Sequence, residues 1–255
     1  MPQEGFYFNE KAHLYVLDGK PMTGVTTILG VIAKPALIQW AADETAKYLG
    51  WYNEKYTKVP DLELVNKVLN VDSIEEWQKV LCEARLAHSK KKTDAGSIGT
   101  DVHAEIEKLV KASMQNATGR IPQGKVDMIE DPKVKSIVEK FVAWVEENQV
   151  TFLESEKRLY SKKYWYAGTT DLLYMKDGKK YIGDIKTSSA IYPEMFMQMA
   201  GYQIALEENG EEDIFGSTII RCGKDGSFEV QDGFDDGKSK RGFLAALELY
   251  RVLNS

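Results

Sequence analysis

The sequence contains few of the residues that build disulfides or soft-metal sites. It has two cysteines, Cys82 and Cys222, and three histidines among its 255 residues. Two cysteines exclude a disulfide scaffold, a four-cysteine zinc site and a four-cysteine iron–sulfur cluster within one chain. Three histidines disfavour a metal site built from several of them. We therefore expect no iron–sulfur cluster.

Long apolar segments are also missing. No run reaches the ~18 residues that a membrane-spanning helix needs. The start of the chain, Met1 to Lys11, has no basic segment followed by an apolar stretch, so we expect no secretory signal. The expected setting is reducing and cytoplasmic, in a bacterium or a phage-infected host cell, without a membrane partner.

Positive charge is not in excess, because the formal net charge is −6. A protein of this charge does not coat nucleic acid through bulk attraction, so any contact with DNA needs local basic patches. Three basic clusters are present: Arg85 with Lys90, Lys91 and Lys92; Lys157 and Arg158 with Lys162 and Lys163; and Lys238 with Lys240 and Arg241. For each cluster taken alone, a solvated surface is the simpler interpretation.

The first 150 residues have mainly helical patterns. Ser73 with Glu76 three residues later is a capping box, and Thr23 is a candidate cap for an earlier helix. The patterns predict short strands over 6–8 and 13–17 and helices over 25–32, 35–48, 73–91, 94–112 and 132–148. Residues 51–72 fit no pattern, and residues 115–130 are expected to form a loop.

From about residue 150, strand-like patterns dominate. They predict strands over 151–160, 164–175 and 180–186, a helix over 193–208, a hairpin of 214–221 with 227–230, and a helix over 238–253. The expected fold is α/β or α+β, a mixed central sheet flanked by helices after a largely helical N-terminal half. The length suits one domain over 1–255, with a helical region at 1–150 and a core at 151–255.

The segment around Asp177-Gly178 is the most informative part of the sequence. Asp-Gly between two strand-like runs favours a two-residue type I′ turn. Such a turn fixes the register, so that Asp171 faces Asp184. Directly opposed residues on one face have Cβ atoms about 5 Å apart, where like charges are destabilising.

A bound divalent cation would remove this repulsion, because hard cations take carboxylate oxygens. The strand period of two places Lys186 on the same face as Asp184, about 6.5–7 Å along the strand. A metal there could polarise a phosphate and activate water, and the lysine could stabilise charge developing on phosphorus. Two alternatives stay open: Asp-x-Lys is usually a surface charge pair, and Asp177-Gly178 can belong to a longer loop with another register.

Several short motifs occur in an order that is known from one nuclease family. They are Gly99-Thr100-Asp101-Val102-His103, Gly168-Thr169-Thr170-Asp171, Gly183-Asp184-Ile185-Lys186-Thr187-Ser188 and Gln198-Met199-Ala200-Gly201-Tyr202. With Glu156 as a first motif, the series resembles RecB-type PD-(D/E)xK nucleases, a group that includes phage-type exonucleases and the mitochondrial genome maintenance exonuclease. The opening Val25-Thr26-Thr27-Ile28-Leu29 and the later Gln39-Trp40-Ala41 are also similar to phage members.

The resemblance implies a restriction-endonuclease-like sheet and a site that binds one or two Mg²⁺ or Mn²⁺ ions. His103, Asp171, Asp184 and the carbonyl of Ile185 would be the metal ligands. Lys186 would be the catalytic lysine. Without the other motifs, a half-buried His103 bonded to a neighbouring glutamate would be the preferred interpretation.

The remaining motif residues would assist this centre. Glu156 would orient water or metal, although Glu154, two residues earlier, is an alternative for the same motif. Gln198 and Tyr202 lie four apart, so they share a helix face, and the resemblance implies that they support Lys186 and the DNA strand. By itself, Tyr202 would be interpreted as ordinary core.

The sequence thus predicts a Mg²⁺- or Mn²⁺-dependent deoxyribonuclease acting from a free DNA end, in recombination, repair or phage DNA processing, with a recombination or single-strand-binding protein as a partner. Basic side chains near residue 162 would follow phosphates and aromatic ones would stack on unpaired bases, and we name six DNA-binding residues: Lys157, Arg158, Lys162, Lys163, Tyr164 and Trp165. An amphipathic hairpin with core aromatics is an equal alternative. For the function, the alternatives are an endonuclease with the same core and a catalytically silent nucleic-acid-binding scaffold.

Overall fold

The computed structural model describes residues 5–50, 62–211, 213–233 and 237–255. The described chain forms two compact units, one of residues 1–32 with 99–255 and one of residues 33–98. This grouping differs from a boundary near residue 150, because the N-terminal strands belong to the same unit as the large sheet. Among the described residues, no helix is long and apolar enough to cross a membrane.

The first unit is built on a mixed sheet whose strand order is β1-β2-β3-β5-β6-β7-β8, with β4 paired to β5. The strands are β1 (Phe6–Asn9), β2 (Leu14–Leu17), β3 (Lys20–Gly24), β4 (Thr151–Ser161), β5 (Tyr166–Lys176), β6 (Lys179–Lys186), β7 (Ile214–Cys222) and β8 (Phe228–Gly233). β3 pairs with β5 and β6 pairs with β7 in parallel, and the other pairs are antiparallel. This confirms the mixed α/β fold that the sequence predicts.

The helices are α1 (Val25–Ile28), the 3-10 helix η1 (Leu29–Val31), α2 (Pro35–Tyr48), α3 (Leu62–Leu69), α4 (Ile74–Gln115), α5 (Gln123–Asp127), α6 (Pro132–Glu147), α7 (Pro193–Glu208) and α8 (Lys238–Leu253). Proline begins α2, α6 and α7, as its fixed φ and missing N–H favour. In α6, the Asp131 carboxylate caps the first turn by accepting N–H bonds from Lys133 and Val134. The predictions for α2, α6, α7 and α8 are confirmed.

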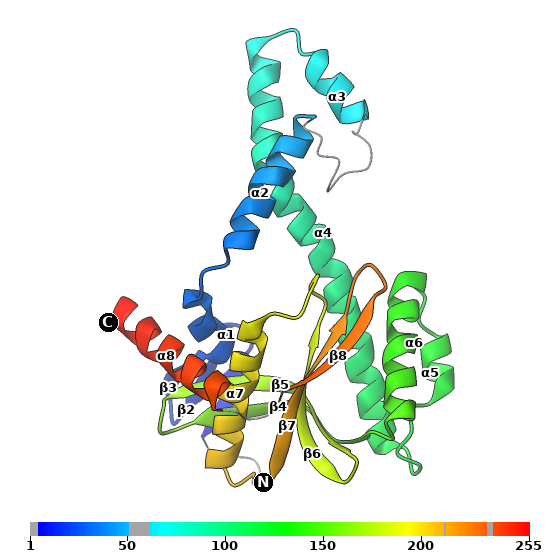
Figure 1. Ribbon diagram of the computed structural model, residues 1–255, viewed down its shortest axis with the longest axis vertical. Coiled ribbons are helices and arrows are strands. Elements are labelled where there is room, and N and C mark those ends of the chain that lie inside the picture. The colour runs from blue at the N-terminus through cyan, green and yellow to red at the C-terminus, as the bar shows by residue number, and fades with distance from the viewer. Residues whose placement is uncertain (1–4, 51–61, 212, 234–236) are drawn as a thin grey trace. The chain divides into compact units, whose positions relative to one another are not determined.

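The sheet has a helix layer on each face. Figure 1 shows α7 and α8 beside one face and α5 and α6 beside the other. On the α7 face, Met199 and Tyr202 pack in one buried cluster with strand residues such as Ile219. On the other face, Trp144 of α6 meets Tyr174 edge to face, with ring centroids 5.9 Å apart. Burial of these apolar faces fixes which strand residues point to which side.

The predicted turn between β5 and β6 is confirmed. Asp177 has φ +52° and Gly178 has φ +70°, as a type I′ turn requires. The register follows from it, because Leu173 pairs with Ile182 and Leu172 pairs with Gly183. The alternative of a longer loop with another register is therefore excluded.

Several local predictions in the N-terminal part are wrong. One uninterrupted helix, α4, replaces the two helices expected over 73–91 and 94–112, because no proline between them breaks the backbone hydrogen bonds. Gly24 caps α1 without a side-chain bond, so Thr23 is not the cap. Thr23 instead belongs to β3, a strand that the sequence patterns missed, and α5 interrupts the expected loop of 115–130.

The second unit consists of α2, α3 and the first part of α4. The Ser73 side chain accepts an N–H bond from Glu76, which confirms one half of the capping box, whereas the Glu76 carboxylate accepts from Asp72 and not from Ser73. Glu44 of α2 is buried and forms an ion pair with Lys91 of α4. Residues 51–61 and the side chain of Lys92, part of the first basic cluster, lie outside the described residues.

Candidate active site

Two carboxylates meet at the open end of the β5–β6 hairpin. Asp171 and Asp184 come directly after the last ladder pair, Leu172 with Gly183, so the hairpin register sets them opposite each other. The Ile185 N–H donates a 2.7 Å hydrogen bond to Asp171 Oδ2. Asp184 is only 2% exposed. The sequence-based expectation that these two side chains oppose each other agrees with this arrangement.

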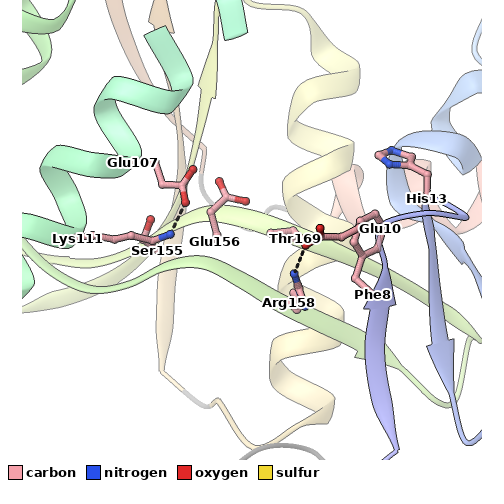
Figure 2. A pocket seen from close by; sticks show the side chains of 9 residues that line it. All are labelled: Phe8, Glu10, His13, Glu107, Lys111, Ser155, Glu156, Arg158 and Thr169. Atoms are coloured by element: carbon pink, nitrogen blue, oxygen red, sulfur yellow. Dashed lines mark hydrogen bonds and ion pairs between the residues drawn. The ribbon is translucent and has the colours of Figure 1, made fainter. Parts of the chain in front are cut away.

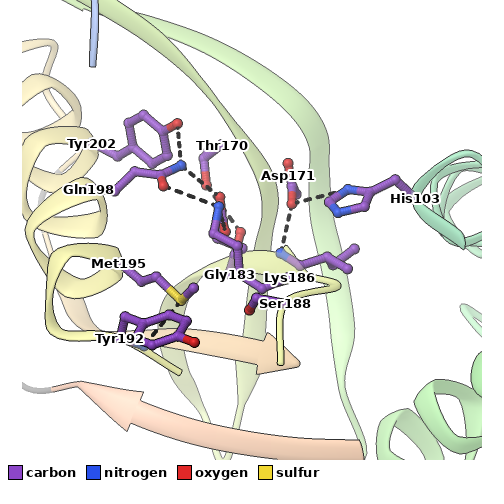
Figure 3. A network of polar contacts seen from close by, with 12 residues as sticks. His103, Thr170, Asp171, Gly183, Lys186, Ser188, Tyr192, Met195, Gln198 and Tyr202 are labelled. Carbon is purple, nitrogen blue, oxygen red and sulfur yellow. Dashed lines mark hydrogen bonds and ion pairs between the residues drawn. The ribbon is translucent and has the colours of Figure 1, made fainter. Parts of the chain in front are cut away.

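Gln198 of α7 joins the second carboxylate, Asp184, to the lysine of the same strand. Figure 3 shows Gln198 next to Tyr202, on the same helix. Gln198 Nε2 donates to Asp184 Oδ1 at 3.0 Å and to the Tyr202 hydroxyl at 2.8 Å, and its Oε1 accepts from Lys186 Nζ at 3.1 Å. Lys186 Nζ also lies 2.5 Å from Asp184 Oδ2. One amide thus holds both charged groups, which is the supporting place expected for Gln198 and Tyr202.

Close packing of α7 against β5 depends on Gly168. A Cβ atom at this position would lie 2.6 Å from Tyr202 Cε1, which is closer than real Cβ contacts come. The missing side chain lets the Tyr202 ring lie against the strand and its hydroxyl reach Gln198. The glycine of the Gly168-Thr169-Thr170-Asp171 motif therefore has a packing reason.

The electrostatics of the centre are unfavourable for two negative charges. Burial, and next the charge of Asp184, raise the pKa of the Asp171 carboxyl well above its usual range. The Ile185 N–H and the Lys186 ammonium act in the opposite direction and do not outweigh these causes. A cation that contacted both carboxylates would remove the repulsion.

His103 of α4 is placed beside this pair. Its Nδ1 lies 3.7 Å from Asp171 Oδ2. Burial lowers the pKa of His103, which favours the neutral imidazole, the form that binds metals. One turn earlier, a Cβ atom at Gly99 would lie 2.6 Å from Thr187 Oγ1, so glycine is what permits α4 to approach the end of β6.

Glu156 lies on β4 across from Asp171, since the flanking ladder pairs are Ser155 with Leu172 and Lys157 with Thr170. Its backbone has φ +53°, a left-handed conformation that costs a non-glycine residue about 1–2 kcal/mol. Partial burial and the charge of Glu107 raise the pKa of the Glu156 carboxyl, and Asp184 is a further cause. Glu156 is therefore within electrostatic reach of the centre, whereas Glu154 forms an ion pair with Lys157.

An open pocket of about 510 Å³ begins at Glu156. Glu107 and Lys111 of α4 line one side and Phe8 and Arg158 line another (Figure 2). Lys111 forms an ion pair with Glu107, and the Arg158 guanidinium lies 5.7 Å from the Phe8 ring centroid. The lining has mixed charge, and Glu156 is the candidate-site residue that belongs to it.

Among the residues named for DNA binding, the basic ones differ in their partners. Lys157 Nζ contacts Glu154 at 2.5 Å and Glu211 at 2.7 Å. Arg158 Nη2 lies 4.0 Å from Glu10, and Lys163 Nζ lies 4.9 Å from the Tyr164 ring centroid. Arg158, Lys162 and Lys163 are all exposed. The ammonium of Lys157 is thus already paired with two carboxylates of the protein.

The aromatic residues between β4 and β5 also contact other parts of the protein. Trp165 Nε1 donates to the Pro21 carbonyl at 3.1 Å, and Tyr164 packs against the core cluster below α7. Tyr166 is fully buried against Phe243. These contacts favour the interpretation of an amphipathic hairpin over that of a free stacking platform.

The donor atoms of the centre fit a hard divalent cation. Asp184 Oδ2 is buried and accepts no hydrogen bond, and its near neighbour is the Lys186 ammonium. In the part of the chain that the structure describes, no three His, Cys, Asp or Glu side chains form a ready-made metal-binding group. Asp171, Asp184 and the Ile185 carbonyl, with His103 beside them, would hold the ion once Lys186 turns away from Asp184.

Sequence reasoning missed one residue of the centre, Arg221. It pairs with Lys186 in the parallel ladder of β6 and β7 and is 8% exposed. No sequence signal fixes this pairing, because the two strands are connected through α7 and not through a short turn. The sequence patterns indicated only that Arg221 lies at the end of the strand expected over 214–221.

Comparisons with known proteins add no relative. No protein-family model matches the chain, and no curated protein matches it either.

Proposed function

We propose that the protein is a Mg²⁺- or Mn²⁺-dependent deoxyribonuclease of the RecB-type PD-(D/E)xK kind that hydrolyses DNA from a free end. The observation that carries this proposal is the opposed pair Asp171 and Asp184, with Lys186 joined to Asp184 through Gln198. A purely structural sheet gains nothing from two opposed carboxylates, because like charges on directly opposed residues are destabilising.

The protein groups supply binding, orientation and charge at the reacting phosphate. When bound between the carboxylates, the metal would supply Lewis acidity toward a phosphate oxygen and a lower pKa for water. Lys186 turns from Asp184 toward the phosphate and stabilises the charge that develops on its oxygens. Gln198 retains Asp184 in place during this movement, because its Nε2 bond does not involve Lys186.

Hydrolysis adds water to phosphorus and breaks the bond from phosphorus to the 3′ oxygen of the neighbouring nucleotide. The products are a 5′-phosphate and a 3′-hydroxyl, and a proton of the water passes to the leaving oxygen through solvent. Glu156 faces Asp171 and has a raised pKa, so its carboxyl is placed to orient that water. His103, on the other side, is held neutral by burial and adds a nitrogen donor.

The test is digestion of end-labelled linear single- and double-stranded DNA beside covalently closed circles, with Mg²⁺, Mn²⁺ or EDTA. Wild type is compared with Lys186→Ala and with Lys133→Ala, a matched loss of one exposed lysine on α6. Metal-dependent loss of linear DNA by the wild type and by Lys133→Ala, but not by Lys186→Ala, would support the proposal. Cleavage of circles would replace the exonuclease by an endonuclease at the same site, and full activity of Lys186→Ala would contradict the assignment.

A further inference from the structure

Cations other than Lys186 gather where β6 and β7 end. Arg221 is the ladder partner of Lys186, and the two strands run parallel. Neighbouring strands lie about 4.8 Å apart, and side chains that are level with each other leave the sheet on the same face. The Arg221 side chain therefore leaves the sheet on the same face as that of Lys186.

Arg221 is held in a fixed position with donors to spare. Its side chain is only 10% exposed, and Nε donates to Glu229 Oε2 at 3.1 Å. Nη1 donates to Ser227 Oγ at 2.9 Å and lies 3.5 Å from the Ser188 carbonyl. Within the described residues, Nη2 has no hydrogen-bond partner. A planar, immobilised guanidinium with free N–H groups is preorganised for an oxyanion.

Lys224 approaches the same place from the β7–β8 turn. The turn is closed by bonds from Gly223 N to the Ser227 carbonyl (2.8 Å) and from Gly226 N to the Gly223 carbonyl (2.9 Å). Lys224 Cε lies 3.6 Å from the position that a Cβ of Gly99 would take, the point at which α4 meets Thr187. The side chain thus lies near the carboxyl end of β6, one residue beyond Lys186.

Lys224, in the β7–β8 turn, differs from several lysines of the sheet in its partners. Lys157, Lys176 and Lys180 are each paired with a carboxylate of the protein. Over the described ranges, Lys224 has no carboxylate within ion-pair distance. In a chain of net charge −6, Lys224 adds a positive charge near the end of β6, whereas Arg221 is paired with Glu229 and lies within electrostatic reach of Asp225.

We propose that Arg221 and Lys224 form a subsite for the DNA phosphate next to the one that is hydrolysed. This inference rests on the proposed function, because it takes Lys186 as the position of the reacting phosphate. The free Nη2 of the Arg221 fork would bind a phosphate oxygen and Lys224 would add a point charge, so the pair would position the strand rather than perform the chemistry.

The experiment measures binding of a fluorescein-labelled single-stranded oligonucleotide by anisotropy, in Mg²⁺, over a series of salt concentrations. All proteins carry Lys186→Ala so that hydrolysis does not interfere. Adding Lys224→Ala is expected to raise Kd roughly three- to tenfold and to reduce the slope of log Kd against log salt by about 0.7, because one phosphate contact is lost. Adding Lys133→Ala removes the same charge on α6 and is expected to change neither quantity.

Two further variants separate phosphate binding from a structural role of Arg221. Arg221→Lys keeps the charge but loses the fork, so binding should weaken. Glu229→Gln removes the carboxylate partner of Arg221 and leaves its charge, so binding should stay equal or become tighter. If Arg221 served only to hold β8, Glu229→Gln would weaken binding as much as Arg221→Lys does.

The outcomes also separate this inference from the proposed function. If wild type cleaves linear DNA and Lys224→Ala binds as Lys133→Ala does, the subsite is wrong and the nuclease stands. Equal weakening by Glu229→Gln and Arg221→Lys would likewise overturn the subsite alone. If wild type cleaves no DNA with either metal, both proposals fall together.

Discussion

The β5–β6 hairpin carries two buried polar clusters that follow opposite rules. Near the turn, Lys176 Nζ contacts Asp232 Oδ2 at 2.8 Å, and the Tyr174 hydroxyl donates to Thr218 Oγ1 at 2.7 Å. Thr218 in turn donates to Asp232 Oδ1 at 2.8 Å, so every member has a partner. At the open end, by contrast, Asp171 faces Asp184.

The difference separates polar groups that stabilise the fold from polar groups that indicate a function. A closed polar network serves stability, because each buried group has its hydrogen bond. Two opposed carboxylates are a cost that folding alone does not explain, although Lys186 and Gln198 contact Asp184 and the Ile185 N–H contacts Asp171. Both clusters share strands and turn, so the contrast does not come from a difference in local fold.

The largest expected effect is on catalysis. Lys186→Ala should lower the rate of DNA hydrolysis at least ~100-fold, because one electrostatic stabiliser of the transition state is removed. Its melting temperature should also fall, because buried Asp184 loses its ion pair, so cleavage is compared at a temperature where both proteins are folded. Single-turnover cleavage beside thermal denaturation measures both. If Lys186→Ala loses cleavage only because it unfolds, the open end of the hairpin would serve stability as the turn end does.

A change at the turn end should lower stability and leave cleavage unchanged. Tyr174→Phe deletes the hydroxyl that bonds Thr218 and should reduce the free energy of unfolding by roughly 1–2 kcal/mol, since a buried bond is lost. Cleavage activity at a temperature where both proteins are folded should be unchanged. Urea unfolding together with the DNA assay checks this, and a rate loss without destabilisation would contradict it.

Relief of the carboxylate repulsion should stabilise the metal-free protein. Asp171→Asn removes one of two opposed charges and should increase the free energy of unfolding by up to about 1 kcal/mol in EDTA. Mg²⁺ should raise the melting temperature of the wild type and not that of Asp171→Asn, because ligand binding stabilises the folded state. A destabilised variant in EDTA would show that Asp171 serves the fold through its Ile185 bond.

The smallest effect concerns pH and the ion pairs near the turn. Hydrogen bonds from Lys157 and Lys180 hold the pKa of Glu211 below its usual range. A depressed folded-state pKa gives stability that is present above the unfolded pKa and lost as pH falls through the folded one. The free energy of unfolding of the wild type should therefore exceed that of Glu211→Gln by less than about 1 kcal/mol at pH 7. This difference should vanish in acid. A difference that persists in acid would assign Glu211 a role other than charge.

Local sequence signals were sufficient for the hairpin and for most of the core. Asp177-Gly178 determined the turn, and the turn determined the register that sets Asp171 opposite Asp184. Proline at the first turn located α2, α6 and α7 to the residue. These features depend on neighbours in sequence, so a single sequence contains them.

The features that could not be predicted depend on distant contacts. Arg221 reaches Lys186 only through a parallel pairing across α7. β3 has weak strand character and is held by pairing with β2 and β5. The engagement of Trp165 with Pro21 likewise joins segments far apart in sequence. Each of these contacts depends on tertiary packing, and the hydrophobic periodicity of a single sequence does not predict tertiary packing.

The central claim is that the open end of the hairpin is a cation site and the turn end is not. Calorimetric titration of Mn²⁺ into wild type, Asp184→Asn and Asp232→Asn tests it directly, because the two variants remove one buried or half-buried carboxylate from each cluster. Mn²⁺ binding that is retained by Asp232→Asn and weakened at least about tenfold by Asp184→Asn is the predicted result. Equal binding by all three proteins would contradict the account.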